Sequence, residues 1–173
     1  LSDSQVPDLV TQLAYTHPWL GAVTSSTVDP DGLALTTSTA YEAPGTGWLR
    51  RETRTMPSGA PSTTTSAYWG DDEALTTAVC DLPAGTRQYG FLKSTTLPTP
   101  AVGGAVVTEF VYDEFGRTVG TKRTGDSDWS CVEFDDRGRV VETTFAAFDS
   151  TPARTVTTVH AVGGNPLRSS VTD

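Results

Sequence analysis

The sequence predicts an all-β fold of stacked antiparallel β-hairpins with little or no helix. Threonine supplies 30 of the 173 residues, and its branched β-carbon suits the pleated surface of a sheet better than a helix. Sixteen glycines and eleven prolines interrupt the chain, and strand-like segments recur about every 8–12 residues. Because no segment shows a convincing 3.6-residue period, we expect short strands joined by turns.

The predicted elements follow one another along the chain. Residues 8–15 suit a short helix or an edge strand equally well. The strand-like segments that border Gly-, Pro- and Asp-rich turns are 23–28, 33–41, 48–56, 62–69, 74–80, 154–160 and 167–173. We therefore expect residues 1–173 to form a single β-repeat region. Its clearest repeats lie at 106–145, and degenerate strand–turn–strand units lie at 20–100 and 150–173.

An internal repeat is the clearest signal in the chain. Residues 110–119 and 132–141 match at an offset of 22 residues. Four positions of the repeat correspond in register: Tyr112 with Phe134, Asp113 with Asp135, Gly116 with Gly138, and Arg117 with Arg139.

Each position of this repeat suits one part of a β-hairpin turn. The aromatic residue ends one strand, and the Asp carboxylate can accept hydrogen bonds from backbone N–H groups about two residues later. Glycine suits the point where the chain needs a positive φ, and Arg opens the return strand beside the Asp. An exposed ion pair contributes little, so we expect the turn geometry to matter more.

Charge and hydropathy exclude two classes of partner. The net charge is −9 and the pI is about 4.5, so a phosphate backbone would be repelled and nucleic acid is not expected as a partner. The longest nearly apolar run, 101–107, is too short to span a membrane. Residues 1–4 contain neither Met nor a signal peptide, which suggests a processed chain or a piece of a longer one.

Two cysteines, Cys80 and Cys131, are expected to pair. Scarce lysine and abundant Thr, Ser and Gly favour an extracellular or cell-surface location, where two cysteines indicate a disulfide. Closing a loop of about fifty residues would stabilise the fold by about 4 kcal/mol. Two buried free thiols are the alternative. Trp129 precedes Cys131 by two residues, so both should point to one face of a strand, with the indole against the disulfide.

No catalytic residue, cofactor or metal site is predicted. The only histidines, His17 and His160, lie in no recognisable nucleophile pattern, and no Gly-x-Ser-x-Gly, phosphate-loop or His-Glu-x-x-His motif occurs. A Ser/His/Asp triad scattered through the sequence stays open. The acidic clusters 71–73 and 126–128 could offer oxygens to calcium, but neither has a calcium-loop pattern, so solvated turns are favoured.

Two other features admit a functional interpretation beside a structural one. Four tryptophans could form a sugar-stacking platform, although aromatic residues in a thin β-fold more often pack in the core: Trp19, Trp48, Trp69 and Trp129. Residues 29–32, Asp-Pro-Asp-Gly, could be a self-cleavage element. A type I or II turn, with Pro following the first residue and Gly closing it, is the favoured interpretation.

The repeat resembles the YD repeat of RHS proteins. Residues 112–117, Tyr-Asp-Glu-Phe-Gly-Arg, match its pattern, and residues 134–139 repeat it with Phe for Tyr. The two copies cover roughly 106–145. The stretches 42–47 and 82–94 are similar to those of secreted actinobacterial members of this group. The self-cleaving core region of these proteins is approached only at 29–33, before a threonine-rich strand, so that activity is not implied.

The resemblance implies a long curved sheet of stacked hairpins, which in this family spirals into a hollow shell. Such shells commonly enclose a toxin, and teneurin-like relatives serve as extracellular adhesion scaffolds. The expected function is therefore a non-catalytic extracellular scaffold, a section of a shell or stalk that encloses or presents a toxin or other domain. Its partners would be further repeats, other copies, toxin cargo or a cell-surface ligand. An adhesive module that binds glycan or protein is the alternative, and a self-processing segment is the second.

Overall fold

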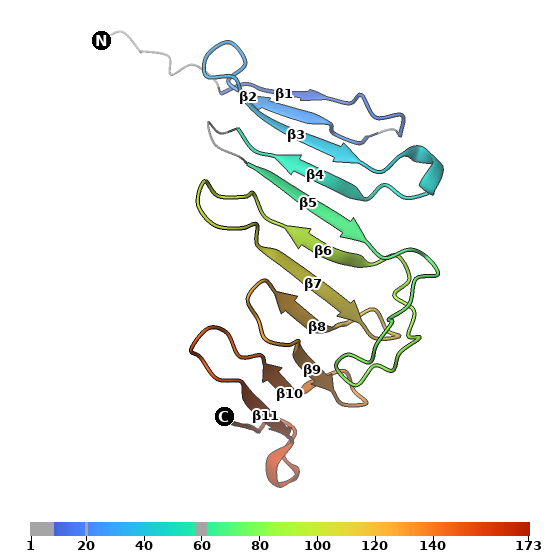
Figure 1. The fold of residues 1–173 in the computed structure, drawn as a ribbon, viewed down its shortest axis with the longest axis vertical. Helices are drawn as coiled ribbons and strands as arrows, with labels where there is room; N and C mark the ends of the chain where they lie inside the picture. The colour runs from blue at the N-terminus through green and yellow to red at the C-terminus, as the bar shows by residue number, and fades with distance from the viewer. Residues whose placement is uncertain (1–8, 20, 58–61) are drawn as a thin grey trace, which may run out of the picture. The chain divides into compact units, whose positions relative to one another are not determined.

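The computed structural model describes residues 9–19, 21–57 and 62–173. It shows twelve antiparallel strands in one sheet, and each strand lies beside its neighbours in the sequence (Figure 1). The prediction of an all-β fold of antiparallel hairpins with little helix is confirmed. The strands are β1 Thr11–Ala14, β2 Ser25–Val28, β3 Leu35–Tyr41, β4 Arg51–Thr55, β5 Thr63–Tyr68, β6 Leu92–Thr96, β7 Val107–Tyr112, β8 Thr118–Arg123, β9 Ser130–Phe134, β10 Val140–Phe145, β11 Arg154–His160 and β12 Ser169–Thr172.

Helical structure in the described chain is limited to two single 3₁₀ turns, η1 Pro44–Thr46 and η2 Val162–Gly164. The segment that suited either a helix or an edge strand contains β1, which pairs with β2. Residue 8 of that segment lies outside the described residues. None of the described residues belongs to a helix with the length and apolarity needed to cross a membrane.

The chain divides into two compact units. The first comprises the described residues up to 66 together with 96–105, and the second comprises 67–95 together with 106–173. The expectation of a single β-repeat region over 1–173 stays a prediction. Each unit is described by itself below.

Threonine hydroxyl pairs add to the backbone pairing between strands of the first unit. Residues of β3 and β5 alternate in exposure, as expected for a sheet with two distinct faces. Hydroxyl groups pair across neighbouring strands, with 2.8 Å between the Oγ1 atoms of Thr27 and Thr36 and 2.8 Å between those of Thr55 and Thr63. Such cross-strand pairs stabilise a sheet with little apolar core, which accounts for the heavy use of threonine.

The second unit has a hydrophobic core formed by strands and a loop. Leu75 from the loop between β5 and β6 packs with Val111 of β7 and Val119 of β8, and all three are buried. The partly buried side chains that pack against this core are Trp69, Val79, Cys80, Leu82, Trp129 and Phe134. Residues 70–91, which we name the 70–91 loop, therefore supply much of the core.

The expectation of a strand over 74–80 is wrong. The 70–91 loop contains only the isolated bridges between Ala74 and Arg87 and between Val79 and Leu82. At the second bridge, Cys80 and Asp81 adopt φ of 48° and 60° and form a tight two-residue turn. A turn with two residues of positive φ ends the extended chain before a full strand can form.

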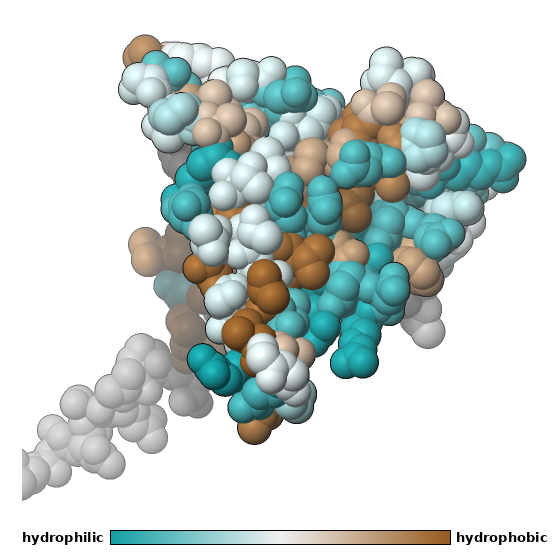
Figure 2. Space-filling model, turned by 90° about the horizontal axis from the view of Figure 1, so that it is seen from below, coloured by the Kyte–Doolittle hydropathy of each residue, from teal (hydrophilic) through white to brown (hydrophobic). Residues whose placement is uncertain are grey.

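The core is small for a chain of this length, and many apolar side chains stay exposed. In Figure 2 the hydrophobic residues lie in small groups interrupted by hydrophilic ones. Leu33 is 76% exposed and Phe115 is 73% exposed. A thin sheet has little interior, so apolar burial contributes less to its stability than in a domain with a large core.

Candidate functional site

The first repeat turn lies between β7 and β8 and is organised by Asp113. Its backbone N–H donates to the carbonyl of Arg117 at 3.0 Å, and Gly116 N–H donates to the carbonyl of Asp113 at 3.0 Å. The carboxylate oxygen Oδ1 accepts from the N–H groups of Phe115 and Arg117 at 3.0 and 2.9 Å. Gly116 has φ of 75°. One buried carboxylate thus satisfies the turn's backbone donors and positions the Arg117 side chain.

The second repeat turn, between β9 and β10, has the same arrangement. Asp135 N–H donates to the carbonyl of Arg139 at 2.9 Å, and Gly138 N–H donates to the carbonyl of Asp135 at 2.8 Å. Oδ1 of Asp135 accepts from the N–H groups of Arg137 and Arg139, each at 2.9 Å. In each turn a guanidinium Nη2 lies 2.6 Å from Oδ2 of its Asp. The sequence repeat is therefore also a repeat of hydrogen bonds.

A β-bulge follows the arginine in both hairpins. Val119 is the extra residue of β8, because Thr118 pairs with Tyr112 and Gly120 with Val111. The second hairpin has its extra residue, Val141, at the corresponding position of the repeat. A bulge bends its strand and increases the local twist, so both repeat hairpins carry the same distortion.

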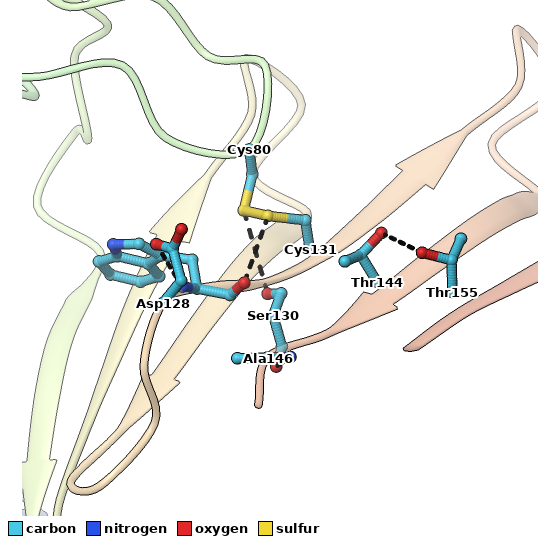
Figure 3. Close-up of a disulfide and its surroundings, with 8 residues drawn as sticks. Cys80, Asp128, Ser130, Cys131, Thr144, Ala146 and Thr155 are labelled. Atoms are coloured by element: carbon cyan, nitrogen blue, oxygen red, sulfur yellow. Dashed lines mark hydrogen bonds between the residues drawn. A yellow bond between two sulfur atoms is a disulfide. The ribbon is translucent and has the colours of Figure 1, made fainter. Parts of the chain in front are cut away.

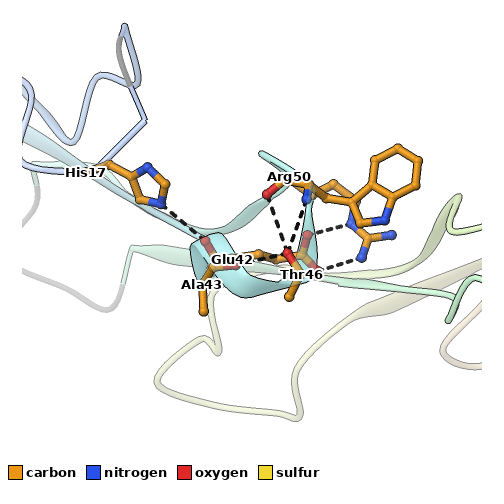
Figure 4. Close-up of polar contacts among 6 residues, drawn as sticks. His17, Glu42, Ala43, Thr46 and Arg50 are labelled. Atoms are coloured by element: carbon orange, nitrogen blue, oxygen red, sulfur yellow. Dashed lines mark hydrogen bonds and ion pairs between the residues drawn. The ribbon is translucent and has the colours of Figure 1, made fainter.

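A third hairpin, between β3 and β4, has the same neck with different residues. Glu42 follows the aromatic Tyr41, and its N–H donates to the carbonyl of Arg50 at 3.0 Å. The Arg50 guanidinium donates to both carboxylate oxygens of Glu42, at 2.6 and 2.8 Å (Figure 4). Glu52 is the extra residue of a bulge beyond the arginine. We name this shared unit of aromatic residue, carboxylate, arginine and bulge the hairpin neck.

Sequence comparison missed this third hairpin neck because its turn is longer. Residues 43–49 separate the carboxylate from the arginine, whereas three residues do so in each of the two repeat turns. The signal that could have found it is the aromatic–acidic pair Tyr41-Glu42 with a later Arg. His17 supports this neck: its Nδ1 accepts from Trp19 N–H at 3.1 Å, so Nε2 carries the proton and donates to the carbonyl of Glu42 at 3.2 Å.

Planar side chains lie against the glycines of the two repeat turns. Phe91 stacks on Tyr112 with 4.8 Å between ring centroids, and a Cβ on Gly116 would lie 2.8 Å from the Phe91 ring. The Arg117 guanidinium lies 4.3 Å from the ring centroid of Phe134, and a Cβ on Gly138 would lie 3.4 Å from it. Each glycine therefore supplies a positive φ and a flat contact surface, Gly116 for a ring of the 70–91 loop and Gly138 for the guanidinium of the preceding hairpin.

This contact predicts that Gly116→Ala costs more than the positive φ alone explains. Gly85→Ala is the matched control, because Gly85 has φ of 91° but an added Cβ would meet nothing within 4 Å. We expect the control to lose about 1–2 kcal/mol of unfolding free energy and Gly116→Ala to lose a further 1 kcal/mol or more, roughly the cost of overpacking. Urea unfolding of both variants measures the difference. Equal losses of unfolding free energy in the two variants would show that the Phe91 ring moves away from the added methyl group without a cost in stability.

The pH dependence of stability tests the second hairpin neck. Hydrogen bonds from the Arg139 side chain, then from its backbone, lower the pKa of Asp135 from 3.8 to about 2. A carboxyl group whose pKa is lower in the folded state stabilises the fold above its unfolded pKa, and this contribution is lost as pH falls toward 2. Asp135→Asn should therefore destabilise the protein at pH 6 and show a shallower loss of melting temperature between about pH 4 and 2. The exposed neighbour Asp136, changed to Asn, is the control, and identical acid profiles for the two variants would contradict the prediction.

The predicted disulfide between Cys80 and Cys131 is confirmed. The two sulfurs are bonded at 2.03 Å, with 5.3 Å between the Cα atoms, and the bond joins the 70–91 loop to β9 (Figure 3). A Cβ on Gly120 would lie 2.8 Å from Sγ of Cys80 and 3.3 Å from the Trp129 indole. Both groups thus lie against the glycine of β8, where a larger residue would exclude them.

Gln88 is a structural residue that sequence reasoning missed. Its side chain is fully buried, its Nε2 donates to the carbonyl of Tyr112 at 3.1 Å, and its Oε1 accepts from Tyr112 N–H at 2.8 Å. The amide thus pairs with the end of β7 as a neighbouring strand would. A Gln in a turn-rich segment carries no local signal of burial, because its partner lies 24 residues away.

The other predicted candidates have structural contacts. Asp126 accepts from Arg123 N–H at 2.7 Å, and Asp128 accepts from Trp129 N–H at 2.8 Å, so both carboxylates serve local turns. Among residues 9–19, 21–57 and 62–173, no three His, Cys, Asp or Glu side chains are grouped as a metal site would require. His160 donates from Nε2 to the carbonyl of Val140 at 2.8 Å.

The Asp-Pro-Asp-Gly segment forms a turn between β2 and β3. Gly32 N–H donates to the carbonyl of Asp29 at 3.1 Å, with Pro30 as the second residue of the turn. The Asp29 carboxylate accepts from Leu33 N–H at 2.9 Å. The segment therefore forms the turn that the sequence favoured, and the Asp29 carboxylate stabilises this turn by accepting the hydrogen bond from Leu33.

The four tryptophans are divided between the units. Trp19 and Trp48 belong to the first unit, and Trp48 is 43% exposed. Trp69 and Trp129 belong to the second unit, where they line a common cleft. Trp69 also donates from Nε1 to the carbonyl of Phe110 at 3.1 Å, which fixes the ring against β7.

Comparison with known proteins does not assign this chain to a family. No protein-family model matches the chain, and a search of curated proteins finds no match. The YD-repeat resemblance therefore stays a prediction that rests on the two repeat turns and their sequence.

Proposed function

We propose that this chain is a non-catalytic extracellular scaffold, a section of an RHS/YD-repeat shell or stalk that encloses or presents a toxin or other domain. The observation that carries the proposal is the hairpin neck: three hairpins among the described residues share the hydrogen bond from the acidic residue's N–H to the arginine carbonyl, the ion pair between the two side chains, and the bulge. Because the hairpin neck recurs together with its bulge, its repetition builds an extended surface, as in repeat proteins.

Contacts between successive segments of the second unit support a mechanical role. The Phe91 ring of the 70–91 loop lies against the first repeat turn, and the Arg117 guanidinium of that turn lies against the second, so neighbouring segments stabilise one another. The side chains of the hairpin necks are engaged with the backbone and with each other, which leaves their carboxylates little freedom to act on a substrate. The arrangement of these side chains therefore favours a structural role over a catalytic one.

The extracellular part of the proposal rests on the disulfide and on composition. Disulfides persist mainly in oxidising compartments, and this one ties a core-forming loop to the sheet. Only two of the 173 residues are lysine. Both features fit a surface or secreted protein.

Fractionation of the source cells tests the proposal. An antibody against this chain, followed by peptide mapping under alkylating conditions, should find its peptides in the surface or secreted fraction, with Cys80 and Cys131 oxidised. The peptides should belong to a polypeptide that contains further YD repeats. Recovery with a cytosolic marker protein and two reduced thiols would overturn the proposal. Measuring the intact mass of the purified chain after incubation tests the self-processing alternative, which requires cleavage near Asp29.

A further inference from the structure

A small cleft in the second unit lies where the 70–91 loop meets β6 and β7. Its volume is about 250 Å³, below the range of about 300–1,000 Å³ that drug-sized ligands occupy. Its lining includes two indoles, two carboxylates, an ammonium group and the buried valine of β7: Trp69, Trp129, Glu73, Glu109, Lys93 and Val111. The cleft is thus sized for one small group with apolar and polar contacts.

Part of the cleft already binds a cation from the protein itself. The Lys93 ammonium lies 4.3 Å from the ring centroid of Trp69 and forms an ion pair with Glu73. The hydrogen bond from Lys93 is the largest cause that holds the pKa of Glu73 below its usual value. An indole face and a carboxylate together are therefore sufficient to hold an ammonium group here.

The cleft contains a second indole and a second carboxylate. Trp129 and Glu109 line it as well, and Glu109 is exposed. With Glu73 and Lys93 counted, the ionised groups of the lining carry one net negative charge. The chain as a whole carries −9, which attracts cations and repels anions over a longer range.

We propose that this cleft binds an organic monocation, an ammonium or guanidinium group, between the Trp129 indole and the Glu109 carboxylate. The cation belongs either to a free small molecule or to a Lys or Arg side chain of a partner. Lys122 lies directly opposite Glu109 in the β7–β8 register and shares its face of the sheet, so it competes for the carboxylate. We therefore expect weak binding, with a Kd in the millimolar range.

Titration of the full chain, followed by the indole N–H signals in NMR spectra, tests the proposal. The probes are choline and arginine methyl ester as cations, methyl glucoside as a neutral ring and acetate as an anion, at constant ionic strength. We expect both cations to shift the Trp69 and Trp129 signals saturably. Trp48 is the internal control, because it is exposed but belongs to the first unit.

Two charge variants sharpen the test. Glu109→Gln should weaken cation binding about fivefold or more, the effect of losing a charged partner, and Lys122→Gln should strengthen it. The exposed Glu114, changed to Gln, should leave the affinity unchanged. A Gly-Arg-Gly peptide that binds more tightly than arginine methyl ester indicates a partner's side chain as the natural guest, and the reverse order indicates a free small molecule.

Three outcomes would overturn the proposal. The first is a shift at Trp48 as large as at Trp129, which would mean unspecific stacking. The second is equal or tighter binding of methyl glucoside, which would mean a saccharide site instead. The third is the absence of saturable shifts with either cation up to about 100 mM, which is far above the expected Kd.

Discussion

Removing the Cys80–Cys131 disulfide is expected to lower the free energy of unfolding by about 4 kcal/mol, as the entropy of a closed loop of this length predicts. The cysteines are 51 residues apart in sequence. Typical domains have about 5–15 kcal/mol of stability, so the loss is a large share of the total. The effect should be concentrated in the second unit, because the disulfide fastens the 70–91 loop that supplies Leu75 to the core.

Urea unfolding of the Cys80→Ala/Cys131→Ala variant measures this loss, and the wild-type chain unfolded with reductant provides the comparison. Hydrogen exchange should show reduced protection in the 70–91 loop and in β7 to β9. A loss below about 1 kcal/mol would show that packing and Gln88 hold the loop without the covalent bond.

Gln88→Leu is expected to cost about 2–6 kcal/mol, since it leaves two part-buried backbone groups of Tyr112 without their Gln88 partners, each at about 1–3 kcal/mol. The leucine is of similar size, so the loss reports the missing hydrogen bonds more than a cavity. Because Gln88 is fully buried, water cannot easily take over the role of its amide.

Gln12→Leu is the matched control for this variant, because Gln12 lies exposed on β1. Thermal and urea unfolding should show a change within about 0.5 kcal/mol for Gln12→Leu and a far larger one for Gln88→Leu. Gln88→Glu refines the test: it keeps an acceptor for Tyr112 N–H but can donate to the carbonyl only when protonated. Its stability should therefore rise as the pH is lowered toward 4. Similar losses at positions 12 and 88 would contradict the role assigned to Gln88.

The repeat turns could be predicted from sequence because their contacts are local. Asp113 reaches backbone groups two and four residues along, and Asp135 does the same, so spacing alone carries the pattern. The neck of Glu42 and Arg50 shares the backbone hydrogen bond and the ion pair but not the spacing, so the pattern could not be found across its seven-residue turn. The disulfide was predictable since the chain contains one possible pair of cysteines.

By itself, the sequence determined the β-class, the two repeat turns and the cysteine pair, because alternation, turn chemistry and composition act over a few residues. The tertiary structure decided that the 70–91 loop folds onto β7 to β9, that Gln88 completes the end of β7, and that Trp69 and Trp129 share one cleft. The contacts of Gln88 and Cys80 join residues 24 and 51 positions apart. No local propensity encodes such contacts, since they form only when the chain closes those distances to bury a shared core.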